Sequence, residues 1–121
     1  MYLSSLGVSA PSGPPLEIQA VSETPHSLRV TWSPPKPDQI NGHLVNYTIY
    51  FVRSDLNYDG EVIEGTAGNE QLVTIDGRLT TWIIENLRAY SGYTLEISAS
   101  TQMGEGPKSE QVFVSTLETS L

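Results

Sequence analysis

The stretch from Leu87 to Ala99 constrains the fold of this chain more than any other. From Tyr93 onward, apolar residues occupy every second position, at Leu95, Ile97 and Ala99, and polar residues lie between them. Such an alternation predicts a β-strand with one buried face. A tyrosine at the start of this strand, directly after a turn, can bury its ring while its hydroxyl bonds to backbone across the corner. We therefore expect the rest of the chain to supply strands that pack on this one.

Six further segments show alternating apolar residues or a short apolar run between turn signals. They cover residues 16–20, 28–32, 44–51, 72–75, 80–84 and 112–114. Ser33–Pro37 contains three prolines and cannot continue a ladder, because proline lacks the amide donor. Residues 55–69 read as a polar excursion and 104–107 as a loop. No segment has sustained helical periodicity, so the pattern predicts an all-β fold, a seven-stranded antiparallel β-sandwich.

Composition limits the function classes that are open to the chain. Its 121 residues carry 14 acidic and six basic side chains, for a net charge of −8. The bases are scattered, which argues against nucleic acid, anionic membranes and heparin-like polymers as partners. The apolar runs are too short to span a membrane. The absence of cysteine excludes disulfides and thiolate metal sites but leaves the cellular compartment open.

The length suits one domain with short tails. Ser12–Pro15 is a turn-and-linker cluster, so we place the start of the domain at residue 14. Residues 1–13 are expected to be a linker or a cloning remnant, 14–118 the domain, and 119–121 a C-terminal tail. The first ten residues lack the basic start of a signal peptide.

Four features together resemble a fibronectin type III domain over about Pro14–Leu117. They are Pro14-Pro15 before a short strand, the strand and proline run 28–35, the strand 42–51, and the corner, strand and loop from 87 to 109. The resemblance implies an immunoglobulin-like sandwich whose structural core includes Trp32, Tyr47, Leu87 and Tyr93. The sequence departs from the family pattern at Ala89 and Ser91, and its segment 51–82 is longer than usual.

Residues that could carry catalysis are sparse. His26 and His43 lie in separate turns, with neither metal-ligand spacing nor a serine nucleophile motif. Gly104-Glu105-Gly106 lacks the third glycine and the helix of a phosphate-binding loop. We therefore expect neither an enzyme nor a cofactor.

Asp55, Asn57, Asp59 and Glu61 form a weak calcium candidate. Their alternate oxygen side chains and the glycine at position 60 match the first half of a calcium loop. The twelfth position is Thr66, which cannot supply the bidentate carboxylate. A turn-rich acidic hairpin explains the same residues and is the favoured interpretation.

Asn46-Tyr47-Thr48 is an N-glycosylation acceptor sequence, and the strand alternation points Asn46 outward. Asn46 is therefore a glycosylation candidate if the chain is secreted.

The resemblance implies a non-catalytic interaction and spacer module of a multidomain receptor or adhesion protein, in its extracellular portion, with protein partners and neighbouring modules. The alternatives are a module of an intracellular scaffold or muscle-type protein and a spacer domain of a secreted enzyme. The loop 102–107 lacks the Arg-Gly-Asp of integrin-binding family members. Tyr50, Tyr58 and Tyr90 are possible contact anchors, although scattered surface aromatics are also ordinary.

Overall fold

The computed structural model describes residues 8–54 and 69–118. Within these residues the elements, in chain order, are β1 (Leu16–Thr24), β2 (Ser27–Ser33), α1 (Pro37–Ile40), β3 (Asn46–Arg53), β4 (Gln71–Asp76), β5 (Thr81–Ile84), β6 (Gly92–Thr101), β7 (Gly104–Glu105) and β8 (Val112–Ser115). The single-turn helix α1 begins at the last proline of the run 33–37, and no helical periodicity predicts it.

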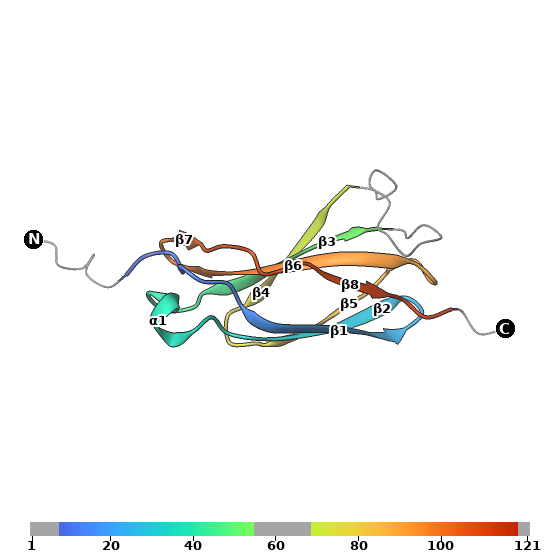
Figure 1. The fold of residues 1–121 in the computed structure, drawn as a ribbon, viewed down its shortest axis with the longest axis horizontal. Helices are drawn as coiled ribbons and strands as arrows, with labels where there is room; N and C mark the ends of the chain where they lie inside the picture. The colour runs from blue at the N-terminus through green and yellow to red at the C-terminus, as the bar shows by residue number, and fades with distance from the viewer. Residues whose placement is uncertain (1–7, 55–68, 119–121) are drawn as a thin grey trace, which may run out of the picture.

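The strands form two antiparallel sheets that pack face to face (Figure 1). One has three strands in the order β1-β2-β5, and the other has the order β4-β3-β6-β7, with β8 also paired to β6. This arrangement confirms the predicted all-β sandwich.

The strand count is eight rather than seven, because the last strand is interrupted. β7 pairs with the Thr101 end of β6, and β8 pairs with the Tyr93 end. Between them lies Pro107, which has no amide to donate. The loop expected at residues 104–107 therefore begins with a two-residue strand.

The core lies between the sheets and is drawn mainly from β2, β3 and β6. Trp32 and Tyr47 meet edge to face, with ring centroids 5.3 Å apart, and Leu87 and Tyr93 belong to the same buried cluster. Within the segment 80–84, alternation with Ile84 predicts that Trp82 points inward. It pairs with the fully buried Val30, but β5 is an edge strand, so 36% of Trp82 remains exposed.

Residues 9–13, expected to be part of a linker, pack against one end of the domain. The Ser9 amide donates to the Asn41 carbonyl at 2.8 Å, and the Thr101 hydroxyl donates to the Ser9 carbonyl at 2.7 Å. Pro11 is buried, and an added Cβ at Gly106 would lie 2.7 Å from the Pro11 carbonyl oxygen. The segment 9–13 therefore contacts both the residues that follow α1 and the region where β6 and β7 meet.

The first and last described residues lie at opposite ends of the long axis (Figure 1). Within the described ranges, no helix is long and apolar enough to cross a membrane.

Candidate interaction surface and the neighbouring pocket

A cluster of four side chains lies on the outer face of the five-stranded sheet, around Tyr50. Tyr50 is on β3, where it points away from the core because its neighbours Ile49 and Phe51 are buried. Its hydroxyl and that of Ser98 on β6 both donate to the same carboxylate oxygen of Glu105. We call Tyr50, Ser98, Glu105 and Lys108 the Tyr50 cluster.

Lys108 completes the cluster from the loop after β7. Its ammonium lies 3.9 Å from the centroid of the Tyr50 ring, a cation–π contact. Residues from two neighbouring strands, β6 and β7, and from one loop thus gather around an aromatic side chain of β3. These contacts hold the ring in one orientation.

The cluster has a defined charge state at neutral pH. The hydrogen bonds from Ser98 and Tyr50 lower the pKa of Glu105, so this side chain stays anionic. The hydrogen bond to Glu105 is the main cause that raises the pKa of Tyr50, and partial burial and the nearby Glu105 and Glu70 charges add to it. The phenol therefore stays protonated and remains a donor.

The face around the cluster is polar and rich in hydroxyls. Across the strands, Tyr50 pairs with Leu72 on β4 and with Glu96 on β6, and Thr48 pairs with Thr74 and Ser98. Leu72 is 60% exposed. An aromatic ring and an exposed leucine amid hydroxyls and carboxylates are suited to contact with another protein.

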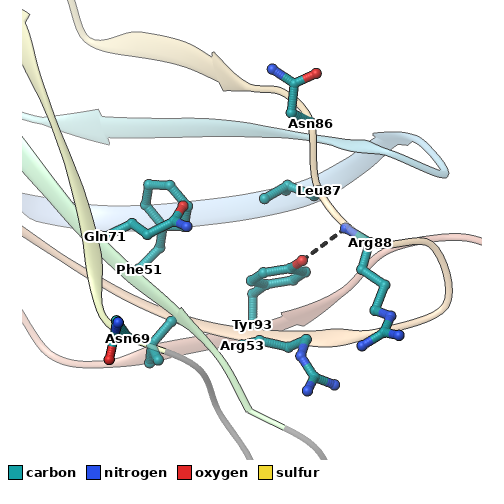
Figure 2. A pocket seen from close by; sticks show the side chains of 9 residues that line it. Phe51, Arg53, Asn69, Gln71, Asn86, Leu87, Arg88 and Tyr93 are labelled. Atoms are coloured by element: carbon teal, nitrogen blue, oxygen red, sulfur yellow. Dashed lines mark hydrogen bonds between the residues drawn. The ribbon is translucent and has the colours of Figure 1, made fainter.

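A pocket of about 380 Å³ opens between the sheets near the Tyr93 end of β6 (Figure 2). Its lining residues are Phe51, Val52, Arg53, Asn69, Gln71, Asn86, Leu87, Arg88 and Tyr93. The two arginines and three carboxamides could donate hydrogen bonds to an anionic group. Arg53 is already engaged in an interaction, so the pocket offers fewer free donors than its lining suggests.

The Tyr93 hydroxyl lies at the wall of this pocket and accepts a 2.8 Å hydrogen bond from the Arg88 amide (Figure 2). The ring is 7% exposed. The Tyr93 ring is therefore buried and its hydroxyl is bonded to backbone across the corner, as the turn and the alternation after it predict.

The remaining sequence candidates do not assemble into one site. Asn46 is partly exposed at the start of β3, opposite Asp76 and Ser100. The imidazole Nδ1 of His26, in the β1–β2 turn, lies 2.9 Å from the Leu87 carbonyl oxygen, so this ring contacts the turn before Tyr93.

The calcium candidates Asp55, Asn57, Asp59 and Glu61, and also Tyr58, lie outside the described residues. Within residues 8–54 and 69–118, no group of three or more His, Cys, Asp or Glu side chains is arranged to hold a metal.

The sequence did not reveal the partners of Tyr50. Alternation places Tyr50 on the outer face, but the sequence places Glu105 in the loop 104–107 with no contact and gives Lys108, which follows that loop, no role. Their position depends on the pairing of β7 with β6, in which Ser100 lies opposite Glu105. A two-residue strand leaves no periodic signal in a sequence.

Comparison with known proteins decides the family. The family model described as "Fibronectin type III domain" matches residues 13–115. This chain belongs to the fibronectin type III domain family. The Tyr50 cluster thus lies on the outer face of the larger sheet of a fibronectin type III domain.

The similar proteins include cell adhesion molecules. Neural cell adhesion molecule L1.1 of Danio rerio is 33% identical over 108 residues, which cover 88% of this chain and 9% of that protein. Cell adhesion molecule DSCAM of Rattus norvegicus is 32% identical over 114 residues, covering 91% of this chain and 5% of that protein. This fibronectin type III domain therefore spans a small part of the length of these relatives.

Among solved structures, the third fibronectin III domain of human KIAA0343 protein is similar, with a TM-score of 0.79. It is 25% identical, and the match covers 95% of this chain and 90% of that chain.

Proposed function

We propose that this fibronectin type III domain is a non-catalytic protein-interaction module of a larger cell-surface adhesion protein. Two similar proteins are named as cell adhesion molecules, which supports the adhesion context. The observation that carries the interaction role is the Tyr50 cluster. It fixes an aromatic side chain on an open sheet face, and tyrosine is enriched among residues that dominate binding energy.

Neighbouring modules in the same protein are part of this proposal. The domain covers only 9% and 5% of the two adhesion molecules it resembles. Its first and last described residues lie at opposite ends of the long axis (Figure 1), so the domain can join two neighbours end to end. The Tyr50 cluster would then face sideways from the string of modules.

An N-linked glycan at Asn46 would share the outer face with the Tyr50 cluster. Asn46 and Tyr50 both belong to β3, and because an even number of positions separates them, they lie on the same side of the strand. Mass spectrometry of the protein from a secretory host tests the modification. If this face binds a partner, we expect Asn46 to be glycosylated only partly or not at all. Complete glycosylation of Asn46 would indicate that the partner binds another surface of the domain.

The extracellular location can be tested with the two lysines of the chain, Lys36 and Lys108, which are both exposed. Cells that express the full-length protein are treated with a membrane-impermeant amine-reactive biotin, and the labelled peptides are identified by mass spectrometry. We expect both lysines to be labelled on intact cells. Labelling only after permeabilisation would place the domain inside the cell and favour a scaffold role.

A further inference from the structure

The two sheets have four edges, which differ in how they are protected. The edges are β1 and β5 in the smaller sheet, and β4 and the β7–β8 side in the larger one. An edge strand presents unpaired backbone N–H and C=O groups that can pair with another chain. Proteins protect such edges with prolines, lysines, bulges or very short strands.

Three of these edges carry such devices. β1 follows Pro14 and Pro15, has two register shifts against β2, and holds Glu17 at a φ of 54°. β5 has only four residues. On the β7–β8 side of the larger sheet, β7 has two residues and is followed by Pro107 and Lys108.

The β4 edge carries none of them. Its six residues pair with β3 in an unbroken register, from Asn46 opposite Asp76 to Phe51 opposite Gln71. The sequence of β4 contains no proline, glycine, lysine or arginine. No strand of the described ranges, 8–54 and 69–118, pairs with its outer edge.

The register shows which backbone groups point outward. The Gly77 amide donates to the Val45 carbonyl at 3.0 Å. Because hydrogen-bonded and non-bonded pairs alternate in an antiparallel ladder, Ile75 and Val73 also face β3 with their backbone groups. The N–H and C=O groups of Leu72 and Thr74 therefore point away from the sheet.

The side chains beside this edge suit a basic, partly apolar partner. Leu72 and Thr74 are exposed on the outer face, whereas Val73 packs against the core. Three carboxylates lie on or beside the same face: Glu70, which raises the pKa of Tyr50 by its charge, Glu96 opposite Tyr50, and Glu105. Two basic side chains also lie near this face, and both already have a partner: Lys108 contacts the Tyr50 ring, and Arg78 is paired with Asp76.

We propose that the outer edge of β4 binds an extended segment of a partner protein, which adds as a further strand with lysine or arginine on its outward face and apolar residues on its inward face. The inference rests on the proposed interaction function and specifies its surface. A second copy of this chain fits the edge less well, because each copy carries a net charge of −8.

The test uses the 121-residue chain and a blocked heptapeptide of alternating lysine and valine, with amide hydrogen exchange followed by NMR. At a peptide concentration about ten times the dissociation constant, we expect the exchange of the Leu72 and Thr74 amides to slow about tenfold. The amides of Val73 and Ile75, which already face β3, should change little. Unchanged exchange at Leu72 and Thr74, or protection centred on another strand, would overturn the proposal.

Two substitutions at one position separate the backbone contribution from the side chain. Thr74→Pro removes an outward amide that β3 does not use, so proline is tolerated there, and we expect peptide affinity to fall about tenfold or more. Thr74→Val keeps the amide and should bind like the parent chain. Equal binding by all three proteins would contradict strand addition.

If Thr74→Pro does not fold, Leu72→Lys supplies the second variant. It keeps the backbone of β4 but places a positive charge against a basic segment, so affinity should again fall, and unchanged affinity would contradict the proposal. A dimer seen by sedimentation and abolished by either variant would assign the edge to a second copy instead. Neither result alters the lysine labelling on intact cells, so this inference and the proposed function can fail separately.

Discussion

The Arg88 amide donates a 2.8 Å hydrogen bond to the phenol oxygen of Tyr93, five residues further along the chain. This bond closes the turn that leads into β6, the strand that pairs with β3, β7 and β8. Beside it, the Leu87 amide donates to the His26 carbonyl at 2.9 Å. The two bonds tie the turn to the strand that follows it and to the β1–β2 turn.

Tyr93→Phe removes the acceptor of this bond and leaves the buried ring in place. We expect the free energy of unfolding to fall by about 0.5–1.5 kcal/mol, measured by chemical denaturation. The lower part of that range is expected because Arg88 is exposed, so water can replace the phenol. An unchanged free energy of unfolding would count against a stabilising role for the corner.

Asn41→Gly tests whether the packed segment 9–13 stabilises the domain. Asn41 has a φ of 64°. Its side-chain nitrogen Nδ2 donates to the Ala10 carbonyl at 3.1 Å and to the Ser12 hydroxyl at 3.2 Å. Glycine keeps the backbone conformation and removes both bonds, so we expect a loss of about 0.5–1.5 kcal/mol.

Asn86→Gly is the matched control for this substitution. Asn86 has the same φ of 64°, and its side chain points away from Tyr93 (Figure 2). Both variants carry the same unfolded-state cost of glycine, so the difference between them reports the bonds to residues 10 and 12. Equal stabilities of the two variants would show that these bonds contribute nothing measurable.

Asp76→Asn should change how the melting temperature depends on pH. Arg78 bonds to the Asp76 carboxylate through its backbone amide at 2.8 Å and its side chain at 3.0 Å, and these bonds lower the pKa of Asp76 from 3.8 to about 2. The folded chain thus holds this proton less tightly than the unfolded chain. The resulting stabilisation is present above pH 3.8 and is lost as the pH falls towards 2.

We therefore expect the parent chain to melt at a higher temperature than the Asp76→Asn variant at about pH 7. The difference should shrink between about pH 4 and pH 2, as measured by thermal melting in matched buffers. A difference that stays constant over this range would show that the pair with Arg78 does not carry the effect.

Glu105→Gln tests the electrostatics of the Tyr50 cluster. The Glu105 carboxylate raises the pKa of Tyr50 because ionisation of the phenol would break their hydrogen bond and place two negative charges side by side. The substituted carboxamide is neutral, so the pKa of Tyr50 should fall towards its usual value near 10. NMR titration of the Tyr50 ring Cζ measures it directly.

Glu96→Gln is the control for this titration, because Glu96 lies opposite Tyr50 in the ladder without contributing to its raised pKa. It should leave the titration of Tyr50 nearly unchanged. A larger effect of Glu96→Gln than of Glu105→Gln would contradict the assignment of Glu105 as the main partner.

The sequence predicted those parts of the fold that depend on local alternation. Ile97 and Ala99 are fully buried, as the period-two pattern required, and the turn before Tyr93 placed its hydroxyl at the corner. The succession of short strands and turns predicted the two-sheet sandwich, and the family resemblance added its immunoglobulin-like type. The exposure of Trp82 was not predicted, because alternation gives the side of a strand but not whether that strand lies at an edge.

The interaction surface could be predicted only in part, for the same reason. Tyr50 was an expected outward residue, but its contacts with Glu105 and Lys108 depend on how a strand 55 residues away pairs. The open edge of β4 likewise follows from strand order, since a six-residue segment of mixed apolar and polar residues reads the same in the middle of a sheet and at its border.

The most direct test of the proposed function is the labelling of Lys36 and Lys108 with the impermeant biotin reagent, compared between adherent and dispersed cells that express the full-length protein. Lys108 belongs to the Tyr50 cluster, whereas Lys36 precedes α1 and provides an internal control. If the outer face of the larger sheet binds a partner at cell contacts, labelling of Lys108 should fall several-fold in adherent cells while labelling of Lys36 is unchanged. Equal labelling of Lys108 in both states, with the protein present at the contacts, would contradict the account.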